Sequence, residues 1–259
     1  MHSLQQRFFP KAALLTIVCE GIANLVASEY PLRRPPLAVR NVSFYQPMPF
    51  RPAGERIRVL YHGIVYPTSG IEEAIQGMPQ WPRDFDLVVR GPGPADYIAS
   101  LKRLARRCGV ESRVEFAPVV PLTELVELAN HCDIGYVAAG DYSPQKRFAL
   151  SNKIFEYLMA GLALCVSDLP EMRRVVAGHD VGRMFTPFTP EAIARAINGF
   201  TRADIDRYKQ RSLEAAKILC WEHERKPLID AYADIFHADT GAERHSHGQN
   251  GAYQTSATR

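Results

Sequence analysis

The chain has 259 residues, of which 46% are hydrophobic and 23% are charged, a composition typical of a soluble protein with one good core. Its net charge of +3, from 31 basic and 28 acidic residues, is too small to indicate a nucleic acid or an anionic membrane as the partner.

Residues 1–52 predict two strands and a helix but no core of their own. The apolar run Ala13–Cys19 indicates a buried strand, Glu20–Ser28 a short helix and Leu37–Arg40 a second strand, followed by several prolines. Two strands and a helix cannot enclose a core. We therefore expect this segment to be the end of a larger unit, so that the chain is a truncated product, a separately encoded half or a fragment.

Strands and helices alternate regularly between Ile57 and Phe200. The expected strands are Ile57–Tyr61, Phe85–Val89, Arg113–Phe116, Asp133–Val137, Leu162–Val166 and Arg183–Phe185. The expected helices are Gly70–Gln76, Ala95–Cys108, Leu122–Asn130, one from about Ser151, Asp168–Ala177 and Pro190–Phe200. Each crossover helix must cover one face of a sheet, which predicts an α/β fold with a doubly wound, parallel, six-stranded Rossmann-like sheet over residues 53–200.

Two helical stretches follow over residues 201–237. They are expected at Ile205–Leu219 and at Glu222–Phe236, with a kink or a restart at Pro227. Residues 238–259 have almost no large apolar side chains and predict a disordered tail, in which His245 and His247 are weak evidence for a metal site.

The cysteines and the apolar runs indicate a cytoplasmic protein without a membrane span. The five cysteines contain no C-x-x-C pair and suggest neither a zinc site nor a disulfide framework, so reduced thiols are expected. The longest apolar run near the start, Ala12–Cys19, is far shorter than the roughly 20 residues that cross a bilayer.

The stretch from Ser151 to Glu171 predicts a helix, a strand buried on both faces and a second helix. Ser151 or Asn152 can cap the first helix, and Gly161 can end it in the left-handed conformation. Lys153 and Glu156 are three residues apart on one side of this helix, which we expect to be polar, close to the N–H groups that favour an anion. An ordinary exposed ion pair is the alternative for these two side chains taken alone.

Residues 151–176, SNKIFEYLMAGLALCVSDLPEMRRVV, resemble the nucleotide-binding segment of the group 1 GT-B glycosyltransferases, in the branch with an N-K-[IL]-F-E-Y-x-x-A-G signature. The resemblance implies that Glu156 accepts hydrogen bonds from the ribose hydroxyls of a nucleotide sugar and that Lys153 faces its diphosphate. It also implies that residues 1–52 are a remnant of the acceptor domain and the linker, and that residues 201–237 pack at the domain junction.

Gly63, at the exit of the first strand of the sheet, can let the backbone approach a diphosphate; the alternative is a glycine needed only for the turn. The family often has Arg directly after this glycine and Lys or Arg before the second, where this chain has Ile64 and Ser69. Both diphosphate cations are therefore missing from their usual places, and catalytic residues are not identified.

Arg90 precedes Gly91-Pro92-Gly93, which resembles the family's G-x-G-P turn. This turn follows the wrong strand for a dinucleotide fingerprint and lacks the third glycine, so a nicotinamide cofactor is not expected. Arg90 either points toward the crevice, where it would supply a missing charge, or is solvated or ion-paired.

The loop before the helix expected from Ser151 carries Lys146 and Arg147, which are either phosphate ligands or a solvated basic pair. The wider family's Glu-x7-Glu signature is incomplete, because Phe148 stands eight positions before Glu156. Of the scattered histidines only His62, at a strand end beside Gly63, lies where chemistry can occur, and it is a possible phosphate contact.

Two functions remain open at this stage. The favoured one is the nucleotide-sugar-binding half of a retaining GT-B glycosyltransferase, with neither a metal nor a cofactor expected beyond the donor itself. Its isolated chain would transfer sugar slowly unless a separate acceptor domain docks on it or the chain self-associates. The alternative is a non-catalytic nucleotide-binding or interaction protein derived from the same fold, which the residues at Ile64 and Ser69 support.

Overall fold

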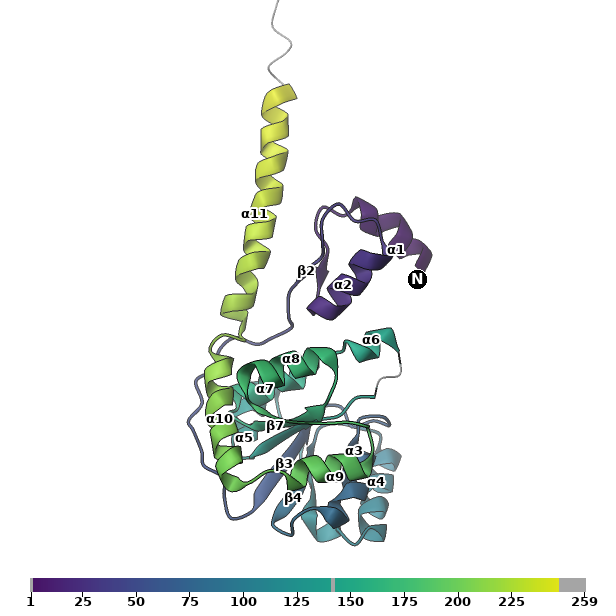
Figure 1. The fold of residues 1–259 in the computed structure, drawn as a ribbon, viewed down its shortest axis with the longest axis vertical. Helices are drawn as coiled ribbons and strands as arrows, with labels where there is room; N and C mark the ends of the chain where they lie inside the picture. The colour runs from purple at the N-terminus through teal and green to yellow at the C-terminus, as the bar shows by residue number, and fades with distance from the viewer. Residues whose placement is uncertain (1, 141–142, 247–259) are drawn as a thin grey trace, which may run out of the picture.

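The computed structural model describes residues 2–140 and 143–246 (Figure 1). Its centre is a six-stranded sheet in the order β5-β4-β3-β6-β7-β8, in which every neighbouring pair is parallel. The strands are β3 (Ile57–His62), β4 (Phe85–Arg90), β5 (Val114–Ala117), β6 (Ile134–Val137), β7 (Ala163–Ser167) and β8 (Gly182–Phe185). The predicted doubly wound parallel sheet is confirmed, and its strand order reverses between β3 and β6.

Helices cover both faces of this sheet. They are α3 (Ile71–Gly77), α4 (Ala95–Arg107), α5 (Leu125–Ala129), α7 (Asn152–Met159), α8 (Pro170–His179), α9 (Pro190–Asn198) and α10 (Arg202–Ala216), and the short α6 (Pro144–Arg147) lies in the connection before α7. Short 3-10 turns lie at Phe9–Lys11, Met78–Gln80, Glu111–Arg113 and Leu122–Glu124. The last of these replaces the start of the helix expected from Leu122, because Pro121 leads the chain into a tight turn before α5 begins.

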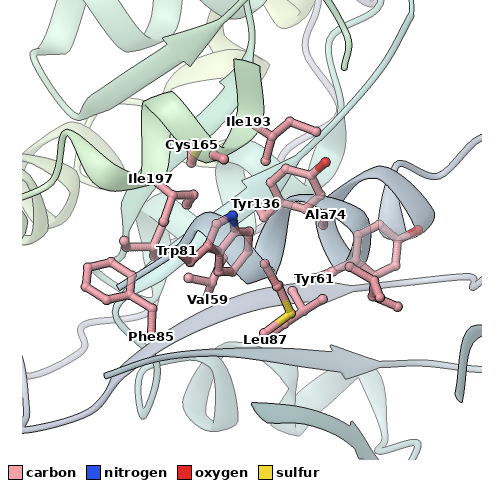
Figure 2. Packing of buried hydrophobic residues seen from close by; sticks show 14 of the residues in the cluster. Val59, Tyr61, Ala74, Trp81, Phe85, Leu87, Tyr136, Cys165, Ile193 and Ile197 are labelled. Atoms are coloured by element: carbon pink, nitrogen blue, oxygen red, sulfur yellow. The ribbon is translucent and has the colours of Figure 1, made fainter. Parts of the chain in front are cut away.

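Two apolar clusters join the helices to the sheet. The cluster in Figure 2 packs α3, α4 and α9 against one face, with Val59, Leu87 and Cys165 contributed by the strands. The other cluster packs α5, α7, α8 and α10 against the opposite face through residues such as Leu60 and Val166. Successive side chains of a strand therefore point into the two clusters in turn, so apolar residues are needed on both faces of the sheet.

The first residues form α1 (His2–Phe8), β1 (Thr16–Ile17), α2 (Glu20–Glu29) and β2 (Leu37–Ala38). β1 and β2 pair only with each other, as a parallel two-stranded sheet. The buried strand expected over Ala13–Cys19 is therefore wrong in its extent, because only two residues find a partner strand and Val18 is 50% exposed. The expected helix from Glu20 is confirmed.

α11 (Trp221–Ser246) is one continuous helix and projects away from the sheet beside the first residues (Figure 1). The expected restart at Pro227 does not occur, because a proline removes a single N–H donor and the surrounding helix formers sustain the rest. The helix also runs beyond Ala238, so the disordered tail expected from there is wrong as far as Ser246, and residues 247–259 lie outside the described residues. No helix within the described residues is long and apolar enough to cross a membrane.

Tyr157 of α7 inserts where β3 and β6 separate. These two strands pair only at Val59 with Ile134 and at Leu60 with Gly135. Beyond that point the Tyr157 hydroxyl accepts a hydrogen bond from the backbone N–H of His62 at 3.0 Å and donates one to the carbonyl of Tyr136 at 3.4 Å. A Cβ atom on Gly135 would lie 2.3 Å from the Tyr157 ring, so the ring occupies the space that a side chain would fill.

This packing predicts that Gly135→Ala lowers the free energy of unfolding by about 2–3 kcal/mol, because the new methyl group must displace a fully buried ring. Gly178→Ala in α8 is the matched control, since a Cβ there meets nothing within 4 Å. It should stabilise the protein by about 0.5–1 kcal/mol. Urea denaturation measures both, and equal small effects would contradict the assigned position of Tyr157.

Candidate functional site

A cavity of about 210 Å³ lies at the carboxyl ends of β3 and β6, where the strand order reverses. Tyr61 enters it from β3, and Ala138 and Ala139 follow β6. Lys153 and Lys146 line the same cavity from α7 and α6. Ligands of open α/β sheets bind at this place in the topology, so the cavity is the candidate site.

The amino end of α7 opens on this cavity. Ser151 is the N-cap residue and lines the cavity, but its side chain makes no capping hydrogen bond. Asn152 is the first helical residue and is exposed. The N–H groups of the first turn are therefore not satisfied by the N-cap side chain, and they favour an anion. The other end matches the sequence expectation, since Gly161 has a φ of 67°.

Lys153 crosses the end of β3 above Gly63. Its Nζ lies 5.3 Å from the centre of the Tyr61 ring, and a Cβ on Gly63 would come within 2.7 Å of its Cε. Gly63 has a φ of 118°, so the position needs glycine for its backbone as well as for the space. Burial lowers the pKa of Lys153, although the charge of Glu156 opposes this effect. Gly63 and Lys153, each expected near a diphosphate, thus contact each other at the edge of the cavity.

Glu156 points to a buried histidine rather than to solvent. Its Oε2 lies 2.7 Å from Nε2 of His62, whose side chain is 0% exposed, while the Glu156 side chain is 27% exposed. No ion pair joins Glu156 to Lys153 in the described chain. Glu156 is therefore only partly exposed, and one of its carboxylate oxygens lies against a buried ring. His62 itself is fully buried and does not line the cavity, so the phosphate contact expected for it is wrong.

Arg90 is the last residue of β4 and lies at the same edge of the sheet as His62. Its carbonyl accepts a hydrogen bond from the N–H of Gly63 at 2.9 Å, and its Cα pairs in register with that of His62. The side chain is only 8% exposed, does not line the cavity, and has no hydrogen-bond partner at Nε or Nη1 among the described residues. The alternative of a solvated arginine is therefore wrong. The guanidinium of Arg90 is buried and does not reach into the cavity.

The two basic residues before α7 differ in position. Lys146 is exposed and lines the cavity, whereas Arg147 is exposed but is not among the lining residues. Residues 141–142 of the preceding loop lie outside the described part of the chain. Only Lys146 is therefore placed by the structure where a phosphate ligand is expected.

Tyr61 and Tyr157 are the site residues that the sequence analysis missed. Burial raises the pKa of Tyr61 to about 12, and its hydroxyl donates to the carbonyl of Ile64 at 2.6 Å, so it shapes the loop after β3. Both tyrosines lie in apolar patterns that indicate core. The signal that could have located Tyr157 is Gly135, since a glycine inside a buried strand marks a close approach by another group.

The sequence model of a family described as glycosyl transferases group 1 matches residues 56–202. Among solved structures, HepE from Anabaena in complex with UDP and glucose superposes with a TM-score of 0.73 at 16% identity, covering 90% of this chain and 65% of that one. Sucrose-phosphate synthase from Thermosynechococcus elongatus superposes with a TM-score of 0.74 at 17% identity, covering 91% and 61%. At these identities the likeness shows the GT-B fold, and this chain spans less than two thirds of either relative.

A catalytic domain of cholesterol-α-glucosyltransferase from Helicobacter pylori gives a TM-score of 0.51 at 17% identity, covering 62% of this chain and 97% of that one. No curated protein matches the sequence.

The 2.7 Å contact between Glu156 and His62 predicts that Glu156→Ala lowers the free energy of unfolding by about 1–3 kcal/mol, because the fully buried ring loses the side chain that packs against its Nε2 edge. Glu214→Ala is the control: Glu214 pairs with Lys217 on the exposed surface of α10. Its loss should change stability by less than about 0.5 kcal/mol. If chemical denaturation gives the same value for both variants, the His62 contact does not contribute to folding.

Proposed function

Because the chain belongs to the group 1 glycosyl transferases, whose family model matches more than half of it, we propose that it binds a nucleoside diphosphate sugar at the cavity and transfers the glycosyl group. The observation that carries the proposal is the position of Lys153 and of the uncapped amino end of α7 at the strand-order reversal. A positive side chain and free backbone donors at one place suit a diphosphate.

Lys153 and Lys146 take the role of the two cations that the family usually places directly after Gly63 and directly before Gly70. Both lysines line the cavity, whereas Ile64 is 65% exposed and Ser69 is buried. We assign the diphosphate to these lysines, to the backbone at Gly63 and to the N–H groups of α7, with no metal ion in this step. Arg90, with its buried and incompletely satisfied guanidinium, adds positive potential behind the site.

Glu156 is proposed as the acceptor for the ribose hydroxyls, as the resemblance of residues 151–176 to the N-K-[IL]-F-E-Y branch implies. His62 contacts Oε2 of Glu156, which leaves the other carboxylate oxygen available to a ligand. Loss of this acceptor in Glu156→Ala should weaken nucleotide binding by about 1.5–3 kcal/mol, the range for hydrogen bonds to a charged group.

In the transfer step the bond from the anomeric carbon to the β-phosphate oxygen breaks, and the electron pair leaves with the diphosphate. The acceptor oxygen bonds to the anomeric carbon, and its proton passes to the departing diphosphate. Cations and N–H donors that stabilise the leaving diphosphate lower the barrier to this step. Retention of the anomeric configuration is proposed from the resemblance alone.

The acceptor is proposed to lie between the first 52 residues and the sheet. α2 approaches α8 there: the N–H of Gly21 donates to the buried carboxylate of Glu171 at 3.1 Å, and Arg174 pairs with Glu20 at 2.7 Å. A separate acceptor domain or a second copy of the chain would complete the cleft at this surface, and closure would exclude water. Without it, slow transfer by this chain is expected.

A non-catalytic nucleotide-binding protein is the second candidate, and Ile64 is the observation that favours it. This apolar side chain is exposed in the loop where the family places a diphosphate cation. The two candidates share the binding site and differ only in turnover.

Isothermal titration with UDP, GDP and ADP tests the shared binding step, with UDP first because the HepE structure contains it. Binding of one of them with a Kd in the micromolar range is expected, and no binding by any would remove both candidates. A donor-consumption assay with the corresponding nucleotide sugars then separates the two. Robust turnover by a monodisperse monomer would contradict the need for a partner.

Lys153→Met should weaken binding of the nucleoside diphosphate by about 10-fold to 100-fold, because it removes a charged donor to the phosphates. Its melting temperature should equal or exceed that of the wild type, since burial disfavours the charged form of Lys153. Lys102→Met is the matched control: Lys102 also lies above an aromatic ring, 5.4 Å from the centre of Phe116, but on α4. Equal affinity losses in both variants would contradict a specific phosphate contact.

A further inference from the structure

A second cavity, of about 540 Å³, lies at the amino ends of β3 and β6, whereas the candidate site lies at the carboxyl ends of the same two strands. We call it the amino-end cavity. Its volume falls within the range of about 300–1,000 Å³ that is typical of small-molecule sites. The basic side chains that line it are those of Arg51, Arg56, Arg58, His131 and Lys209. The amino-end cavity is therefore large enough for a metabolite, and its lining favours an anion.

Among the described residues that line this cavity, Asp133 is the one with a carboxylate, and that carboxylate is already engaged. Its Oδ1 lies 2.9 Å from Nζ of Lys209, whose side chain is 1% exposed. Its Oδ2 accepts a hydrogen bond from the backbone N–H of Arg58 at 2.9 Å. The lysine and the aspartate therefore offset each other, and the arginines supply the positive charge of the lining.

Arg51 enters the amino-end cavity from the connection between β2 and β3. Its Nε donates a hydrogen bond to Oδ1 of Asn130 at 2.7 Å. Asn130 is 1% exposed, and its Nδ2 donates to the carbonyls of Pro49 and Ala160 at 3.0 and 2.9 Å, so its orientation is fixed. No carboxylate of the described residues pairs with Arg51, and its two terminal nitrogens keep their donors free there. A buried amide thus holds a guanidinium whose outer edge has no protein partner in the described chain.

Arg56 and Arg58 are held at the amino-end cavity by carboxylates that do not line it. Nε and Nη2 of Arg56 donate to Asp86 at 2.6 and 2.5 Å, and Nη2 of Arg58 donates to Glu115 at 2.8 Å. Nε of Arg58 is buried and has no hydrogen-bond partner among the described residues. A guanidinium has five N–H donors, more than one carboxylate accepts, so both arginines retain donors for a ligand.

We propose that the amino-end cavity is a second anion site, which binds a small molecule with at least two phosphate groups. The free edge of the Arg51 guanidinium suits bidentate contact with one phosphate. Arg56 and Arg58 bring further donors and charge to the same cavity for the second phosphate. This site is separate from the donor site, so the inference does not depend on the proposed function.

Isothermal titration with inorganic pyrophosphate tests the site in a Lys153→Met background, which removes the cation proposed to bind a diphosphate at the candidate site. We expect one pyrophosphate per chain in this parent. Arg51→Gln should weaken its binding about 10-fold, because charge-assisted hydrogen bonds to phosphate are lost. Arg103→Gln is the matched control: Arg103 is exposed on α4 and does not line the amino-end cavity. It should change the affinity by less than about 2-fold.

Two further titrations sharpen the test. Adding Arg58→Gln to Arg51→Gln should weaken pyrophosphate at least about 30-fold relative to the parent, and Arg56→Gln takes its place if that variant does not fold. Inorganic phosphate, with one phosphate group instead of two, should bind the parent at least about 10-fold more weakly than pyrophosphate.

Equal losses in Arg51→Gln and Arg103→Gln would overturn the inference, as would a dissociation constant above about 10 mM in the parent. Pyrophosphate binding that disappears with Lys153→Met alone would also overturn it, since only the candidate site would then bind the anion. A chain that binds no UDP, GDP or ADP but keeps the expected order of pyrophosphate affinities would overturn the proposed function and support the second anion site.

Discussion

The insertion of Tyr157 between β3 and β6 is the contact on which the site depends. Parallel strands that paired along their whole length would close the sheet at its strand-order reversal. Here the pairing stops after two residues, and the tyrosine hydroxyl takes over the N–H of His62 and the carbonyl of Tyr136. The N–H of His62 and the carbonyl of Tyr136 stay hydrogen-bonded while the strand ends separate, so the cavity forms without leaving these two backbone groups unpaired.

The same contact fixes the rest of α7. Lys153 lies one helical turn before Tyr157 and therefore on the same side of the helix, which directs it across the end of β3 onto Gly63. Glu156 is the neighbour of Tyr157 in sequence and meets His62, whose ring rests on the tyrosine. One buried aromatic side chain thus sets the positions of the cation, the carboxylate and the histidine together.

The fold could be predicted because its signals are local. Apolar runs of strand length alternate with helical patterns, and the six strands were located to within one or two residues. Gly63 followed from the place of ligands in such sheets, and Lys153 from its position near a helix start and from the family resemblance. The contact of Glu156 with His62 and the burial of Arg90 could not be predicted. Both depend on which residues of distant segments share a face of the sheet, and sequence spacing does not show that. The length of β1 likewise depends on how many residues of β2 pair with it, and the continuity of α11 through Pro227 was not indicated by the sequence.

Lys153 and Glu156, the two charged residues of α7, do not pair with each other, and the burial of Lys153 disfavours its charged form in the unliganded protein. Lys153 and Glu156 could neutralise each other on one turn of the helix, yet the ammonium lies above the face of Tyr61 and the carboxylate contacts an imidazole. An ion pair between them would have to be broken before either met a ligand. Because the two side chains contact aromatic rings and not each other, both stay available to a ligand, and the pKa of Lys153 is lowered by its burial. An anionic ligand in the cavity would stabilise the charged form of Lys153, which burial disfavours. The free energy of unfolding should therefore increase as the site is occupied.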